Sequence, residues 1–242
     1  MAVAVGRRVQ IIRWDTGVAA LESDSILLRY PDVEDGSHPV IRKAAGLWAR
    51  QAVARWVVEH RDPAEMLIVE APIIGNRYSE FVQVLPDDAE PALASDTTAF
   101  FYPVPTRDVR AKLEAIRRAT FANPQHPDEA KDAPPEIMDL VWRLACAKAI
   151  ELGLTSAENI EDPSRYDETI YRRFFDHLLR HRNTRAIGIE TFYSGGRSAH
   201  DLDGNITELI ATPSEFENAI ATIEAAMTPE KAASEVENWY RV

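Results

Sequence analysis

Two acidic residues follow or close apolar runs that we predict to be buried strands. Glu70 stands near the end of MLIVEA (residues 66–71), and Asp15 follows VQIIRW (residues 9–14). If the two strands are parallel, their carboxyl ends lie at one edge of the sheet, where α/β proteins bind ligands. A carboxylate there can act as a general base or orient a metal-bound water. We therefore interpret Asp15 and Glu70 as candidate catalytic residues.

The turn after the second run adds two polar side chains to this edge. Glu70 is followed by APIIGNRYSEF, in which Asn76 and Arg77 come directly after Gly75. An amide and a guanidinium at such a turn are candidate substrate-binding groups. Structural explanations remain open: Glu70 can accept N–H bonds of the following turn, and Asp15 can be a solvated loop acid.

A predicted helix over residues 107–119 carries an arginine face. At 100° per residue its arginines gather on one side, whereas Val109, Leu113 and Ile116 lie on the other. Guanidinium groups bind phosphate oxygens in pairs, so this face is a candidate cofactor-binding surface. The alternative is a solvated face on which Glu114 pairs with its neighbours. The candidate arginines are Arg107, Arg110, Arg117 and Arg118.

Strand and helix patterns alternate along the chain. Apolar runs predict strands at 9–14, 66–71, 99–104 and 186–192, and amphipathic patterns predict helices at 40–59, 107–119, 136–152 and 166–182. Such alternation is typical of an α/β fold, here a doubly wound, mostly parallel sheet with flanking helices. We expect a single domain over 1–242, with a helical lid-like region at about 105–182 and a C-terminal helix at about 214–241.

Composition narrows the class of protein. The net charge of −12 disfavours nucleic acid polymers and anionic membranes as partners. The single cysteine, Cys146, excludes an internal disulfide and predicts a buried, inert thiol. The first residues lack the apolar core of a signal peptide, and no apolar stretch is long enough to span a membrane, so we expect a cytoplasmic protein. A homo-oligomer is left open.

Two further motifs are weak. The segment Asp201-Leu202-Asp203-Gly204-Asn205 starts like a calcium loop, but its glycine comes too early and no bidentate Glu follows. The segment Ser194-Gly195-Gly196-Arg197-Ser198 is a candidate anion-binding loop or a simple turn. We assign no metal ligands from the sequence.

Taken together, the LIVEAP strand end and the strand followed by PVPTRDVRAKLEAIRR resemble the later two-thirds of a P-loop nucleoside or nucleotide kinase. The resemblance covers residues 9–192. It implies a base at Asp15, a Walker B-like acid at Glu70 and a lid containing Arg110, Arg117 and Arg118. It also implies ATP and Mg²⁺ as cofactors and phosphoryl transfer to a small hydroxyl-bearing or nucleotide-like substrate.

The chain departs from this family in one respect. No G-x-x-x-x-G-K-[ST] motif occurs, and only MAVAVGRR precedes the first predicted strand. Three explanations stay open: a lost amino-terminal segment, a loss of phosphate binding, or a different parallel α/β fold. The first two predict weak or absent ATP hydrolysis. The alternative function is a non-catalytic protein that binds a nucleotide, an anion or a partner protein.

Overall fold

The chain forms two compact units, which are described separately. The first comprises Met1–Thr98 and Asp203–Val242, and the second Ala99–Leu202. The computed structural model describes residues 6–19, 23–33, 36–126, 129, 133–160, 162, 164–193 and 206–242. The weak motifs at 194–198 and 201–205 lie outside these residues.

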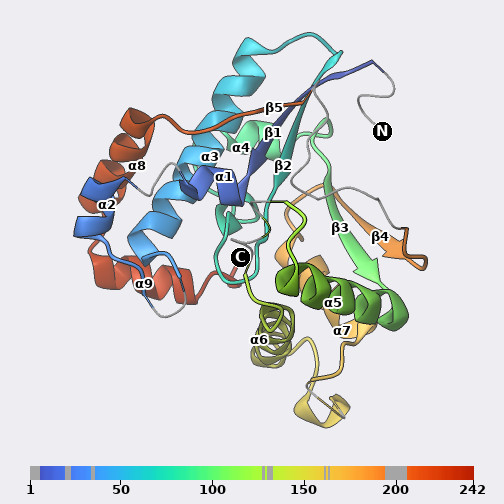
Figure 1. Ribbon diagram of the computed structural model, residues 1–242. Coiled ribbons are helices and arrows are strands. Elements are labelled where there is room, and N and C mark those ends of the chain that lie inside the picture. The colour runs from blue at the N-terminus through green and yellow to red at the C-terminus, as the bar shows by residue number, and fades with distance from the viewer. Residues whose placement is uncertain are drawn as a thin grey trace. The chain divides into compact units, whose positions relative to one another are not determined.

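The first unit contains a parallel sheet in which β1 is the central strand. Strand β1 (Arg8–Arg13) pairs with β2 (Glu65–Glu70) on one side and with β5 (Ile206–Glu208) on the other, in the order β2-β1-β5 (Figure 1). In the β1-β2 register Arg13 lies opposite Glu70. The last residues of both strands therefore lie at the same edge of the sheet, as their parallel direction requires.

Helix α3 (Pro39–Glu59) is the main packing element of this unit. It begins with Pro39 directly after the N-cap His38, whose Nδ1 accepts the N–H of Val40, and it contacts α8 and α9. Most of its first fifteen residues are buried, including the charged Lys43 and Arg50. Because this helix is buried on several sides, its charged side chains need acidic partners within the protein. These ion pairs are described below.

The C-terminal segment forms two helices, not the single helix expected over 214–241. Helix α8 (Pro213–Ala226) ends before Met227, and helix α9 (Pro229–Glu237) begins after the N-cap Thr228. Met227 and Thr228 are extended, and Pro229 has no N–H with which to continue a helix. The Thr-Pro pair therefore starts a new helix, as it does at Thr212-Pro213, where Thr212 and Glu215 form a capping box.

Short elements complete the first unit. They are α1 (Trp14–Ala19), α2 (Asp24–Arg29), the 3-10 helix η2 (Ser79–Phe81) and α4 (Glu90–Leu93). Helix α1 follows β1 without an intervening loop. The region between Gly17 and Pro39, which lacks a clear pattern in the sequence, thus contains helical turns.

The second unit has its own two-stranded parallel sheet with helices in the crossover. Strand β3 (Phe100–Pro105) pairs with β4 (Thr184–Ile189), and the chain between them forms α5 (Arg107–Ala122), α6 (Ile137–Glu151), the 3-10 helix η4 (Ala157–Asn159) and α7 (Glu168–Leu178). Cys146 on α6 is buried, and burial raises the pKa of its thiol to about 11. The thiol is therefore protonated at neutral pH.

Mixed α/β content with small parallel sheets and flanking helices is confirmed. In the described residues, however, the parallel strands belong to two sheets, whereas one doubly wound sheet was predicted. Strand β5 has only three residues, ITE, too few to show a periodic pattern. No helix in the described part of the chain is long and apolar enough to span a membrane.

Candidate functional site

The carboxyl edge of the first unit's sheet carries a row of charged residues. Arg13 ends β1 beside Glu70 of β2, and its Nε donates a hydrogen bond to Glu208 of β5. This hydrogen bond, with the charges of Glu208, Glu70 and Asp15, raises the pKa of Arg13 although burial opposes the shift. The guanidinium of Arg13 therefore stays positively charged and lies among the carboxylates of this edge.

Asp15 lies at the same edge but on a helix. It occupies the first turn of α1, where a carboxylate is favoured by the helix dipole, and its side chain is exposed. Its charge acts on Arg13, Arg77 and Tyr78. The structure thus brings three of the predicted site residues, Asp15, Glu70 and Arg77, to one edge of one unit.

The turn after β2 has an unusual backbone. Gly75, Asn76 and Tyr78 have φ angles of 86°, 57° and 61°. Glycine adopts this left-handed conformation freely and asparagine tolerates it, but for a tyrosine it is a strained one. The turn from Gly75 to Tyr78 must therefore be held in place by its surroundings.

Tyr78 is the anchor of this turn. The side chain is fully buried, and its ring makes edge contacts with Trp14 and Phe81 at centroid distances of 5.1 and 5.8 Å. Its hydroxyl donates to the carbonyl of Arg13 at 3.3 Å, and burial raises the pKa of the phenol. Gly17 on α1 leaves room for this hydroxyl, because a Cβ at that position would overlap it.

Asn76 and Arg77 carry hydrogen-bond donors for which the described residues supply no acceptor. Asn76 is 1% exposed; its Oδ1 accepts the Ser79 hydroxyl at 2.6 Å, but its Nδ2 has no partner in the described part of the chain. Arg77 is half-buried and has no hydrogen bond or ion pair to any described residue. Burial lowers the pKa of Arg77, although the charge of Asp15 raises it.

A buried ion pair supports the turn from the α3 side. Lys43 Nζ lies 3.0 Å from Glu80 Oε1 and 3.3 Å from Glu235 on α9, and both Lys43 and Glu80 are buried. The charges of the two glutamates outweigh burial and raise the pKa of Lys43. The Glu80 carboxylate lies against Gly46, where an added Cβ would overlap it.

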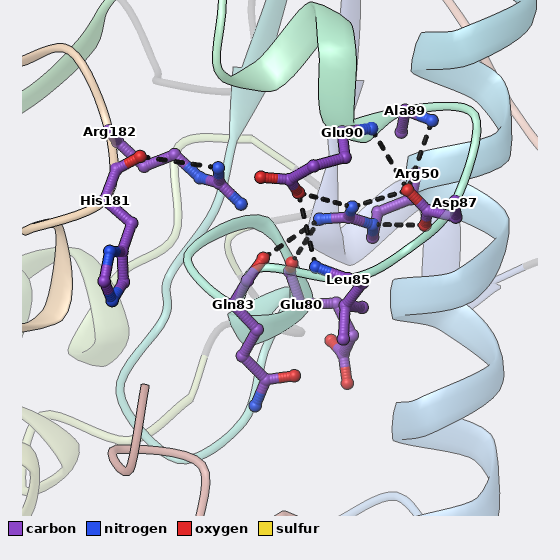
Figure 2. A network of polar contacts seen from close by, with 9 residues as sticks. All are labelled: Arg50, Glu80, Gln83, Leu85, Asp87, Ala89, Glu90, His181 and Arg182. Atoms are coloured by element: carbon purple, nitrogen blue, oxygen red, sulfur yellow. Dashed lines mark hydrogen bonds and ion pairs between the residues drawn. The ribbon is translucent and has the colours of Figure 1, made fainter.

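Arg50 holds the chain that follows the turn. Its side chain is fully buried, and it donates to both carboxylate oxygens of Asp87 at 2.6 Å, to Glu90 at 2.9 Å and to the carbonyl of Glu80 at 2.7 Å (Figure 2). Asp87 also accepts the N–H groups of Ala89 and Glu90. One arginine of α3 thus connects η2, the loop that follows it and α4.

The predicted arginine face belongs to the second unit, where Arg107 and Arg110 are engaged. Arg107 binds the carbonyl of Tyr166 and the carboxylate of Asp167 at 3.0 and 3.1 Å. Arg110 pairs with Glu114 at 2.7 Å, as the alternative interpretation expected, and its guanidinium lies over the ring of Tyr166. These contacts fasten α5 to the start of α7.

Arg117 and Arg118 differ in their surroundings. Arg117 donates to the carbonyl of Ala133 at 2.7 Å, and its Nε is buried without a partner among the described residues. Arg118 is exposed and makes no described contact. On the apolar face of α5, Val109 is buried, whereas Leu113 and Ile116 are 37% and 40% exposed.

Several residues of the site were missed in the sequence. Arg13 is the penultimate residue of the predicted strand at 9–14, and a charge in that position could have been noted as a third edge residue. Glu208 could not have been found, because its strand is too short to recognise. Lys43 and Arg50 have no distinctive local pattern, since their partners are 30 residues or more away along the chain.

The donors and acceptors of this edge suit a phosphate ligand with a divalent cation. Mg²⁺ is commonly bound by one or two carboxylates together with substrate phosphates, and Asp15 and Glu70 supply two carboxylates at this edge. The described residues contain no group of three His, Cys, Asp or Glu side chains arranged to hold a metal ion.

Comparisons with known proteins give no relative from which a function could be taken. No protein-family model, no curated protein and no solved structure matches this chain.

Proposed function

We propose that the first unit binds a small phosphate-bearing ligand, of the nucleotide class, at the carboxyl edge of its sheet. The observation that carries this proposal is the Arg77 guanidinium on the turn after β2, which is half-buried and has no hydrogen bond or ion pair to a described residue. Phosphate oxygens that accept hydrogen bonds from this guanidinium would gain affinity, because hydrogen bonds between charged groups are strong. Asn76 is too deeply buried to contact a ligand, and the strained, firmly held turn to which it belongs gives Arg77 a fixed position.

The charge of this edge specifies how such a ligand would bind. Two arginines, Arg13 and Arg77, face three carboxylates, Asp15, Glu70 and Glu208. A polyphosphate alone would be repelled by the carboxylates, whereas a Mg²⁺ complex would bring compensating positive charge. The proposed ligand is therefore a magnesium nucleotide or another magnesium-bound phosphate ester.

The same groups could carry out phosphoryl transfer, as in the P-loop kinases that the sequence resembles. The hydroxyl oxygen of a small substrate would attack phosphorus while the bond to the leaving phosphate oxygen breaks. Asp15, exposed at the edge, would accept the hydroxyl proton, and Glu70 would support Mg²⁺. Arg107, Arg110 and Arg117 do not enter this proposal, since they already bind groups within the second unit.

A thermal-shift experiment tests the binding step. We expect ATP, ADP or pyrophosphate with Mg²⁺ to raise the unfolding midpoint, because ligands that bind only the native state stabilise it. Without Mg²⁺ the shift should be much smaller. Absence of a shift for every phosphate ligand with Mg²⁺ would contradict the proposal.

Two variants with the same change in net charge test whether the ligand binds at this edge. Arg77→Gln should abolish the shift, whereas Arg173→Gln, which removes an exposed arginine of α7, should leave it unchanged. If both variants lose the same fraction of the shift, only net charge matters and the site is wrong. Transfer of the terminal phosphate of ATP to a hydroxyl compound, measured as ADP formation, should be lost in Asp15→Asn if that residue is the base.

A further inference from the structure

We propose a second ligand site in the first unit, at the amino edge of the sheet, for a planar heteroaromatic compound that carries one anionic group. A cavity of about 450 Å³ opens there, beside the first residues of β1 and β2, Thr207 of β5 and the last turn of α3. Its volume lies within the range of about 300–1,000 Å³ that is usual for small-molecule sites. The charged edge described above is at the other end of the same strands.

Two aromatic rings line this cavity. Trp56, in the last turn of α3, stacks on His60, with ring centroids 5.0 Å apart and planes 6° from parallel. The other four tryptophans of the chain are buried, whereas Trp56 is only half-buried. A half-exposed aromatic pair in a concave surface offers a flat apolar ligand a surface on which to stack.

Hydrogen bonds among the residues that line the cavity determine which donors and acceptors remain for a ligand. Trp56 Nε1–H donates to Gln10 Oε1 at 2.6 Å, which orients the amide and leaves its NH₂ group without a described acceptor. His60 Nδ1 lies 3.1 Å from the carbonyl of Trp56. A carbonyl only accepts, so Nδ1 carries the hydrogen and Nε2 of the neutral ring is an acceptor. One donor and one acceptor are thus available to the polar edge of a heteroaromatic ring.

The charge balance favours a ligand with one anionic group. The residues that line the cavity include two arginines, Arg7 and Arg8, and one carboxylate, Glu65, so the lining carries one net positive charge. Arg8 is paired with Glu65 at 3.3 Å and with Asp62, outside the lining, at 2.7 Å. Arg7 donates to the carbonyl of Pro63 at 2.9 Å and has no ion pair with a described residue. Its guanidinium therefore keeps donors and a full charge for a carboxylate or a phosphate.

Two matched pairs of probes test the site and distinguish carboxylate from phosphate ligands. Nicotinate and nicotinamide differ in charge but share a ring, and AMP and adenosine differ by a phosphate. Titrations are followed by calorimetry and by acrylamide quenching of Trp56, the tryptophan most accessible to the quencher. The Arg77→Gln variant serves as the background, so that failure of the phosphate site at the carboxyl edge cannot be mistaken for failure of this one.

We expect nicotinate, AMP or both to protect Trp56 from quenching and to bind roughly tenfold or more tightly than their uncharged partners. Arg7→Gln should remove that difference, while Arg61→Gln, which deletes an exposed arginine outside the cavity, should preserve it. Trp56→Phe should lose the quenching signal and weaken the binding of every probe, because it removes the indole on which the ligand stacks and the donor that orients Gln10. No protection by any probe, or equal affinity for charged and uncharged partners, would overturn the proposal.

Discussion

Replacing Arg50 with methionine should lower the free energy of unfolding by about 3 kcal/mol or more. The methionine fills much of the space of the arginine stem, but it leaves Asp87 and Glu90 facing each other without the guanidinium that binds both. It also removes the donor to the carbonyl of Glu80. Urea unfolding followed by tryptophan fluorescence measures the change.

Arg55→Met is the matched control on the same helix. Arg55 pairs with Glu215, but their side chains are 47% and 30% exposed, so the pair is solvated. Its loss should lower stability by less than about 1 kcal/mol. Equal effects of the two substitutions would mean that the Arg50 network contributes no more than a surface ion pair.

The Arg50 network also predicts a pH dependence. Burial raises the pKa of Asp87, but the hydrogen bonds and charge of Arg50 outweigh it, so the pKa lies below its ordinary value. A carboxylate with a lowered folded-state pKa stabilises the fold above its unfolded-state pKa of about 4 and loses this effect as the pH falls further. The fall in stability below pH ~4 should therefore be smaller in Arg50→Met than in the parent chain.

Gly46→Ala should lower stability by about 2–4 kcal/mol, a large effect for a single added methyl group. The new Cβ would overlap the carboxylate of Glu80. Glu80 is 3% exposed and faces Lys43, so its displacement would leave a buried ammonium without its main partner. We expect the same variant to weaken Mg²⁺-nucleotide binding, because Glu80 lies in η2, directly after the turn that carries Arg77.

Gly188→Ala provides the comparison in a strand. An added Cβ at Gly188 meets no atom within 4 Å, and its φ is not positive. This substitution should leave stability unchanged or raise it by up to about 1 kcal/mol. A similar loss in both variants would show that the Glu80 contact is not the reason for the effect at Gly46.

Local patterns in the sequence predicted the elements whose signal is local. The run MLIVEA became β2, and the segment from Val40 to Glu59 became α3 with one additional residue. The short strand β5 and the helices α1 and α2 lack the length that periodicity needs. The break between α8 and α9 could have been predicted from Pro229, since proline is common at the first position of a helix.

Part of the candidate site could also be predicted from local sequence patterns. Asp15 and Glu70 could be placed at one edge because parallel neighbouring strands end together. The support of the turn could not be predicted, since it depends on Gly17 and Gly46 leaving room for Tyr78 and Glu80. Such close approaches depend on tertiary packing, to which a glycine in a helical pattern gives no direct clue.

Binding of phosphate by the turn after β2 is tested most directly by NMR. The ¹⁵N-labelled protein is titrated with pyrophosphate and Mg²⁺, and the backbone amide signals are followed. We expect the largest chemical-shift changes at residues 75–80 and at the side-chain amide of Asn76, and we expect Arg77→Gln to remove them. Changes confined to the arginines of α5, or no change at saturating pyrophosphate, would contradict it.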